Sequence, residues 1–277
     1  MFVSQSGIAV TAKGPARRGA TTRGLAVQTH VVGALLMREL HTRFGRDNIG
    51  YLWAVFEPGL LALAVTLLHL AASSRTGFGM DPIPFWVVGY TPFCMFRFMV
   101  LRAEAAIESN RTLLYHRMVT ITDLLIARNL LEFASAAMAM AILVGGAWLC
   151  GLGNLPDRPL LMFAGMAQLW WLSFGLSLIV AAASENSTVV QRIIHPATYV
   201  SLPLSGAFFL LKWIPHPWRE YLTWSPLISP FEQIREGQFA SFDSAYVYPT
   251  YVIGWSLVLT ILGLVAIRIT RRRMHLD

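Results

Sequence analysis

The stretch RELHTRFGRDNIGYLWAVFEP, residues 38–58, changes from strongly charged to strongly apolar without a flexible linker. Around its start, apolar residues recur every four positions, as on one face of a helix: Val32, Leu36, Leu40 and Phe44. We therefore predict an amphipathic interfacial helix over 30–47, lying along a membrane surface before the chain enters the bilayer at Tyr51. The same pattern also fits a helix that only anchors the N-terminal segment.

The composition indicates a membrane protein. Of 277 residues, 55% are hydrophobic and 13% are charged, against about 25% charged in a typical soluble domain. A spanning helix needs about 20 mostly apolar residues. We predict an all-α integral membrane fold with six transmembrane helices at about 52–72, 83–101, 120–150 (most apolar over 130–150), 160–183, 193–211 and 249–267. Pro196 and Pro203 interrupt the fifth, which a membrane helix tolerates when neighbours satisfy the freed carbonyls.

Basic residues decide the orientation, because Lys and Arg collect in the cytoplasmic flanks of membrane helices. Sixteen flank one end of the predicted spans: Lys13, Arg17, Arg18, Arg23, Arg38, Arg43, Arg46, Arg102, Arg111, Arg117, Arg128, Arg192, Arg268, Arg271, Arg272 and Arg273. Five flank the other: Arg75, Arg158, Lys212, Arg219 and Arg235. We predict a multi-pass protein with both termini in the cytoplasm and a disordered basic tail over 1–28. The net charge of +7 is then a topology signal, and no nucleic-acid partner is predicted.

The sequence lacks the common motifs of catalysis and ATP binding. It contains no H-E-x-x-H, no G-x-S-x-G and no G-x-x-x-x-G-K-[ST] phosphate loop. Its two cysteines, Cys94 and Cys150, lie in apolar runs without disulfide or metal-ligand spacing. We therefore predict no enzyme, no metal site and no cofactor bound by this chain. A membrane enzyme acting on lipid-linked sugars is the distant alternative.

Ionisable residues inside the predicted spans are mechanistic candidates, because a charge within the bilayer usually pairs or faces a cavity. Glu57 lies about 9 Å deep in the first span and Arg97 about 7.5 Å deep in the second, at 1.5 Å per residue. The two spans are antiparallel, so both charges fall at a similar depth. We predict that Glu57 and Arg97 pair, directly or through Arg128, Glu132 or a partner subunit. Alternatively, Arg97 faces a channel and meets an anionic substrate.

The opening stretch and ESNRTLLYHRMVTITDLLIARNLLE, residues 108–132, resemble the permease subunits of type-2 ABC exporters. The resemblance is to the subgroup that exports capsular polysaccharide (KpsM-type), a relative of the O-antigen permeases (Wzm-type). It covers nearly all of the chain after residue 28, so residues 29–277 are expected to form one transmembrane domain. A permease of O-antigen, teichoic acid or a drug is the alternative within the superfamily.

The resemblance implies a location, a substrate and a set of partners. The chain would form a homodimer in the bacterial inner membrane and export lipid-linked capsular polysaccharide. Two copies of a separate ABC ATPase would bind ATP and Mg²⁺. A periplasmic polysaccharide copolymerase, an outer-membrane export channel and membrane lipids would complete the assembly.

The resemblance also implies that the surface helix and the cytoplasmic loop at about 103–120 dock on the ATPase. We assign this coupling role to the polar residues of both elements: Arg38, Glu39, Arg43, Arg46, Glu104, Glu108, Arg111, Tyr115 and His116. The alternative for the loop is a solvated turn that follows the distribution of positive charge.

Aromatic residues are candidates for contact with the polymer, because a sugar ring has apolar faces. On spans one, two and five we assign channel lining to Phe56, Tyr90, Phe93, Tyr199 and Phe208. In the loop 212–248 the resemblance implies re-entrant or interfacial short helices that close the channel to the periplasm. The gate candidates there are Trp213, Trp218, Tyr221, Trp224 and Phe231. Helix packing, lipid contact or an aromatic belt is the alternative for both sets.

Overall fold

The computed structural model describes residues 18–44, 56, 59–60, 63–68, 80–114 and 119–273, and these ranges contain helices and connecting loops but no strands. The helices are α1 (Arg18–Phe44), α3 (Pro82–Glu104), η1 (Glu108–Asn110), α4 (Arg111–Leu114), α5 (Ile121–Leu149), α6 (Pro159–Asn186), α7 (Thr188–Val200), α8 (Leu202–Ser205), η2 (Leu211–Trp213), α9 (Trp218–Thr223), α10 (Ile228–Gln238) and α11 (Pro249–Arg273). The all-α prediction is confirmed for these residues.

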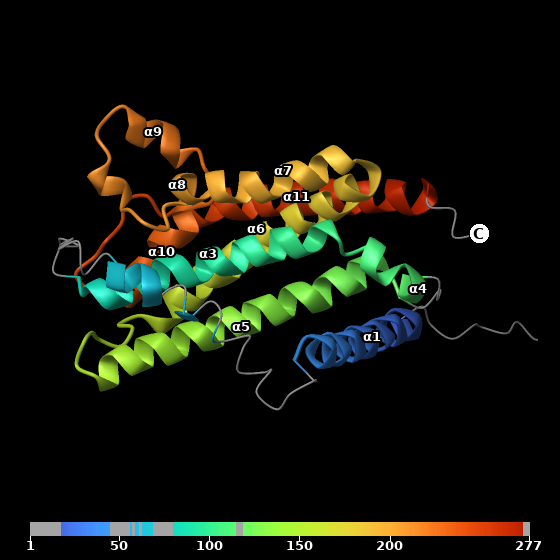
Figure 1. Ribbon diagram of the computed structural model, residues 1–277, viewed down its shortest axis with the longest axis horizontal. Coiled ribbons are helices and arrows are strands. Elements are labelled where there is room, and N and C mark those ends of the chain that lie inside the picture. Colours follow the sequence, from blue (N-terminus) through green and yellow to red (C-terminus); the bar gives the residue numbers. More distant parts are fainter. Residues whose placement is uncertain are drawn as a thin grey trace, which may run out of the picture.

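Four of the described helices, α3, α5, α6 and α11, are long and apolar enough to cross a membrane. They coincide with the second, third, fourth and sixth predicted spans and run along the long axis of the molecule in Figure 1. The start of α5 is fixed by a capping box, in which Asp123 N–H donates to Thr120 Oγ1 (3.1 Å) and Thr120 N–H donates to Asp123 Oδ2 (3.2 Å).

Of the two other predicted spans, the first lies mostly outside the described residues and the fifth is not a single helix. Most of 52–72 lies outside the described residues, although 56, 59–60 and 63–68 are helical. The prediction of one helix over 193–211 is wrong. α7 ends at Val200, α8 is a single turn, and Gly206 then adopts φ of +79°, a left-handed conformation that favours glycine. The chain therefore leaves the helical path before it reaches residue 211.

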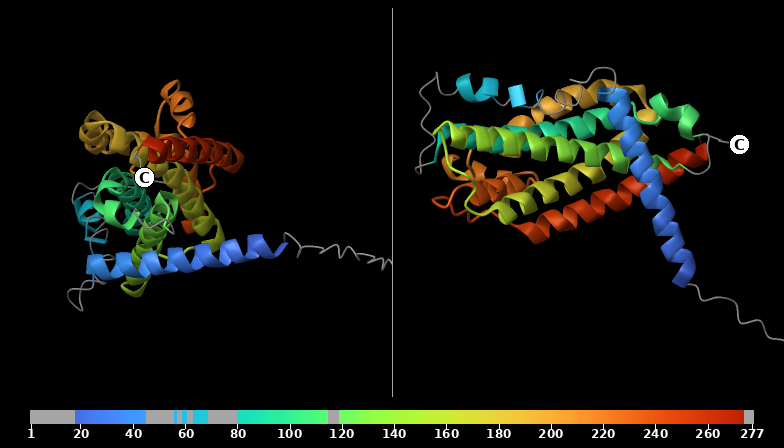
Figure 2. Two further views of the ribbon diagram at one scale, coloured as in Figure 1. Left: turned by 90° about the vertical axis from the view of Figure 1, so that its right-hand side faces the viewer. Right: turned by 90° about the horizontal axis from the view of Figure 1, so that it is seen from below.

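α1 lies across the bundle near one end. Figure 1 shows it close to end-on, and Figure 2 shows it crossing the long helices. It packs against α5, and Leu35 and Glu39 are buried among those of its side chains that the structure describes. α1 begins at Arg18, so 18–28 is helical where we expected a disordered tail. We call this end of the molecule the α1 end and the opposite one the α9 end.

α6 is the central helix and contacts α3, α5, α7, α10 and α11. Its close approach to α11 depends on two glycines. A Cβ added to Gly263 would lie 2.5 Å from Leu178 Cβ, and one added to Gly175 would lie 2.8 Å from Leu259 Cβ. Small residues of this kind let membrane helices approach closely and gain van der Waals contact.

At the α9 end, α10 is buried against α6 and α3. Arg235 is fully buried, and its guanidinium donates to three backbone carbonyls at 2.6–2.9 Å: those of Gly206, Ala207 and Phe209. Glu232 is also buried and accepts hydrogen bonds from Leu211 N–H (3.1 Å) and Ser244 Oγ (2.6 Å). These contacts fix the turn after α8 onto α10.

The packing of α6 on α11 leads to a stability prediction. Gly263→Leu should destabilise the protein by about 1–3 kcal/mol, the usual cost of overpacking, because the new side chain collides with Leu178. SDS-induced unfolding of the purified protein in mixed micelles measures the change. Gly254→Leu on the same helix is the control, since nothing lies within 4 Å of a Cβ there. Equal unfolding curves for the two variants would contradict the proposed packing.

Candidate coupling site at the α1 end

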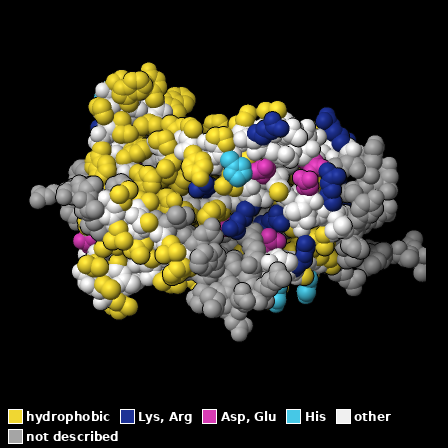
Figure 3. Space-filling view, in the orientation of Figure 1, with side chains coloured by type: hydrophobic (Ala, Val, Ile, Leu, Met, Phe, Trp, Pro, Cys, Tyr) yellow, Lys and Arg dark blue, Asp and Glu magenta, His cyan; other side chains and the backbone are white. Residues whose placement is uncertain are grey.

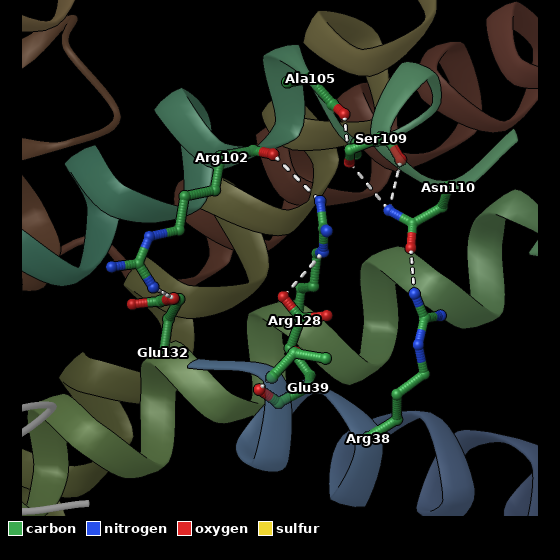
Figure 4. Close-up of polar contacts among 10 residues, drawn as sticks. Arg38, Glu39, Arg102, Ala105, Ser109, Asn110, Arg128 and Glu132 are labelled. Carbon is green, nitrogen blue, oxygen red and sulfur yellow. Dashed lines mark hydrogen bonds and ion pairs between the residues drawn. The ribbon is translucent and has the colours of Figure 1, made fainter. Parts of the chain in front are cut away.

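Polar side chains from α1, α3, η1 and α5 meet at the α1 end, as Figure 4 shows. We call this cluster the charged joint and define it by six residues: Arg38, Glu39, Arg102, Asn110, Arg128 and Glu132. It lies where α1 crosses the first turns of α5 and the last turn of α3.

The centre of the joint is an ion pair between α1 and α5. Arg128 Nε lies 3.1 Å from Glu39 Oε1, and the two side chains are only 14% and 9% exposed. Arg128 Nη1 also donates to the backbone carbonyl of Arg102 at 3.5 Å. One guanidinium therefore contacts α1 and α3 from a position on α5.

Two further contacts complete the joint. Arg102 of α3 forms an ion pair with Glu132 of α5. Arg38 Nη2 donates to Asn110 Oδ1 at 2.9 Å, and Asn110 Nδ2 donates in turn to the carbonyl of Ala106 at 3.0 Å. Since Asn110 is buried, this contact ties α1 to the turn between α3 and α4.

Ion pairs outside the joint extend the connection to the remaining helices at this end. Glu104 Oε2 of α3 lies 3.2 Å from His195 Nε2 of α7, a pair that is ionic when the histidine is protonated. Arg111 Nη2 of α4 lies 2.6 Å from Glu185 Oε1 of α6. On the face of the molecule that Figure 3 shows, charged side chains gather toward the α1 end, and hydrophobic side chains cover most of the other half.

The cost of burying charge explains this arrangement. A carboxylate that leaves water among apolar helices is strongly destabilising unless a cation lies beside it. Glu39 and Glu132 are buried, and each has an arginine on a neighbouring helix. Separating α1 from α5 would leave the Glu39–Arg128 charges uncompensated, so the joint favours movement of the two helices as one unit.

Four of the predicted coupling residues make contacts at this end. Arg38 and Glu39 belong to the joint, and Glu104 and Arg111 form the pairs with α7 and α6. Glu108 is exposed in η1. The remaining predicted residues are not described at the level of side chains: Arg43 (in α1), Arg46, Tyr115 and His116.

Sequence reasoning missed the partners within the joint. Arg128 and Glu132 were named only as possible bridges between Glu57 and Arg97, and their pairs with Glu39 and Arg102 were not predicted. Their spacing of four residues places both on one face of α5, a signal that this face meets other charged helices. Glu57 lies outside the described residues, so its pairing with Arg97 stays a prediction. Arg97 lies over the ring of Tyr199, with Cζ 4.0 Å from the ring centroid.

The predicted channel-lining residues have different surroundings. Tyr90 stacks on Phe208, with ring centroids 5.6 Å apart and planes within 10°. Phe93 is buried in the core of the protomer, whereas Tyr199 and Phe56 are exposed. Phe93 therefore packs inside the bundle and lines no open surface of this chain; the roles of the others stay predictions.

The gate candidates also separate into two groups. Phe231 is buried in α10, whereas Trp213 is 40% exposed and packs one side against Phe85, with ring centroids 5.6 Å apart. Trp218, Tyr221 and Trp224 are exposed on and beside α9. Gating by any of them stays a prediction. Within the described part of the chain, no three His, Cys, Asp or Glu side chains gather in a way that could hold a metal ion.

Comparison with known proteins places this geometry in context. The profile of the ABC-2 type transporter family matches residues 30–239, which include the joint and α10. The capsule polysaccharide export inner-membrane protein CtrC of Neisseria meningitidis serogroup B is 35% identical over 87% of this chain and 91% of its own. BexB of Haemophilus influenzae, with the same description, is 34% identical over 89% and 93%. The polysialic acid transport protein KpsM of Escherichia coli is 30% identical over 91% and 97%.

The ion pair at the centre of the joint leads to a prediction. Arg128→Gln should lower the free energy of unfolding by about 3–5 kcal/mol, because buried Glu39 loses the guanidinium that lies 3.1 Å from its carboxylate. SDS-induced unfolding measures this change. The Glu39→Gln/Arg128→Gln double variant should recover part of the loss, since no unpaired charge remains.

Arg158→Gln is the control for this substitution. Arg158 is 55% exposed and lies 3.5 Å from Glu236, so its removal should cost less than about 1 kcal/mol. If Arg128→Gln proves as mild as Arg158→Gln, the Glu39–Arg128 pair is not what holds α1 on the bundle.

Proposed function

The chain belongs to the ABC-2 type transporter family, and on this premise we propose that it is the inner-membrane permease subunit of a capsule polysaccharide exporter. The assignment of the substrate rests on the similarity, over 87–91% of this chain, to CtrC, BexB and KpsM. The descriptions of these proteins name capsule polysaccharide or polysialic acid. The chain is a transporter subunit and not an enzyme.

A separate ATPase supplies the energy in this proposal, because the sequence contains no phosphate-binding loop. Two ATPase copies bind ATP and Mg²⁺ and contact the α1 end of a permease homodimer from the cytoplasm. The excess of basic residues at this end supports the orientation. The exposed surfaces of α1 and η1 receive the ATPase, and the charged joint transmits its movement to α3 and α5.

The α9 end faces the periplasm in the same proposal. The turn after α8 is held on α10 by Arg235, so opening the exit for a polymer requires this region to shift against α3 and α6. The polysaccharide is carried with its lipid anchor. A periplasmic copolymerase and an outer-membrane channel then receive it from the exposed aromatic residues on and beside α9.

Deleting the coding sequence from its native bacterium tests the proposed function. Capsule polysaccharide should continue to be made but accumulate inside the cell, since synthesis does not need the permease. Fractionation and an antibody against the polymer measure both pools, and the wild-type chain on a plasmid should restore the surface pool. Normal surface polysaccharide in the deletion strain would exclude capsule export as the function.

Coupling through the joint leads to a second prediction. Asn110→Ala should reduce polysaccharide export at least about fivefold while the ATPase still binds, because buried Asn110 links Arg38 of α1 to the end of α3 without reaching the surface. Quantitative export in the complemented deletion strain, together with co-purification of the ATPase, measures both properties.

Asn154→Ala is the matched control for this variant. Asn154 is exposed at the α9 end, where its side chain donates to Asp81 Oδ2 at 3.2 Å, so export should stay within about twofold of wild type. Normal export by Asn110→Ala would show that the joint does not transmit the movement of α1.

A further inference from the structure

The contacts between α3 and the segment 195–208 repeat every seven residues along α3. From the α9 end to the α1 end they are the stacked rings of Tyr90 and Phe208, the cation–aromatic pair of Arg97 and Tyr199, and the ion pair of Glu104 and His195. Seven residues are about two helical turns, so the three α3 side chains lie on one face. This face forms a strip of aromatic and ionisable groups along the bundle.

Within this strip, Arg97 has a buried side-chain nitrogen without a hydrogen-bond partner. Arg97 lies within α3, a candidate membrane span, and the nitrogen is its Nε. Its guanidinium lies 4.0 Å from the centroid of the Tyr199 ring. An aromatic face stabilises a cation by only about 0.5–2 kcal/mol, which is less than the cost of a charge within the bilayer.

No carboxylate of the described residues pairs with Arg97. Four acidic side chains at the α1 end have other partners: Glu39 pairs with Arg128, Glu132 with Arg102 and Glu185 with Arg111, and Glu104 lies beside His195. Tyr199 is 59% exposed, so the pair is open to the surface of the protomer. A cation held in this way, beside an exposed aromatic ring, suits the binding of an anionic group.

We propose that Arg97 and Tyr199 form a binding point for an oxyanion of the transported glycolipid, either a carboxylate of the sugar chain or a phosphate of its anchor. The planar guanidinium offers paired donors that match both groups, and the ring of Tyr199 offers an apolar face to the adjoining sugar. The inference rests on the proposed function and adds a chemical requirement: the cargo carries negative charge where it meets α3.

Direct binding to the purified permease–ATPase complex in nanodiscs tests the inference. Three probes are titrated by calorimetry: a hexasaccharide of uronic acid residues, the same hexasaccharide with its carboxylates reduced to alcohols, and dodecyl phosphate. The wild-type complex should bind at least one of the two anionic probes. Arg97→Gln should weaken that binding about tenfold, equivalent to about 1.4 kcal/mol, and leave binding of the neutral hexasaccharide unchanged.

Two variants separate anion recognition from other effects of the substitution. Arg97→Lys keeps the charge but loses the planar fork, so its binding should be intermediate. Arg268→Gln removes an exposed arginine from α11 and should bind as the wild type does. Binding of the acidic hexasaccharide alone assigns the site to the sugar chain, binding of dodecyl phosphate alone assigns it to the anchor, and binding of both assigns it to either oxyanion.

Three results would overturn the inference. In the first, the wild-type complex binds neither anionic probe. In the second, Arg97→Gln binds the anionic probes as tightly as the wild type does, and in the third it weakens binding of the neutral hexasaccharide as much as binding of the anionic probes. If Arg97→Gln and Glu57→Gln lose the same stability without ligand, and Arg97→Gln still binds the anionic probes, Arg97 is the structural partner of Glu57 instead. Each of these results leaves the proposed function standing as long as the deletion strain fails to export capsule.

Discussion

A carboxylate buried among apolar helices requires a cation beside it, and this requirement organises the α1 end of the structure. Glu39 of α1 meets Arg128 of α5, Glu132 of α5 meets Arg102 of α3, and Glu104 of α3 meets His195 of α7. Each pair joins two different helices, so the charges form a series that begins on the surface helix and crosses the bundle. Displacing α1 from α5 would break the Glu39–Arg128 pair, whose side chains are both largely buried, at a cost of several kcal/mol.

In the mechanism that we propose, this series of pairs couples the surface-crossing helix α1 to the long helices. α3 and α5 run from the charged joint to the α9 end, where α10 packs against α3 and α6 and Arg235 fixes the turn after α8. Close contact through Gly175 and Gly263 holds α6 to α11, which leaves little freedom for these two helices to slide. In the mechanism that we propose, a tilt imposed on α1 reaches the far end through α3 and α5, which act as rigid rods.

Hydropathy predicted the four long spans, because length and apolar composition are properties of the sequence alone. Hydropathy failed over 193–211, where Gly206 adopts a left-handed conformation that ends the helix. Arg235, which is distant in sequence, binds the backbone carbonyls of Gly206 and Ala207 at this point. Contacts between residues that are distant in sequence also limited the prediction of the site. Arg38 and Glu39 stood out as charges on a surface helix, but their partners Asn110 and Arg128 depend on the angle at which α1 crosses the bundle. Phe93 was assigned to channel lining and Phe231 to the gate from sequence, yet packing buries both.

The distance between α1 and α5 during the ATPase cycle tests the central claim most directly. Spin labels are placed on His41→Cys of α1 and Ala134→Cys of α5, two exposed positions, in a chain whose Cys94 and Cys150 are replaced by serine. This chain is mixed with an excess of the unlabelled cysteine-free chain, so that pulsed electron–electron double resonance on the permease–ATPase complex measures the distance within one chain. The charged joint predicts one narrow distance distribution that shifts by less than about 2 Å between the nucleotide-free and ATP-bound complexes. A larger shift or a second population on ATP binding would show that α1 moves independently of the spans, contrary to this account.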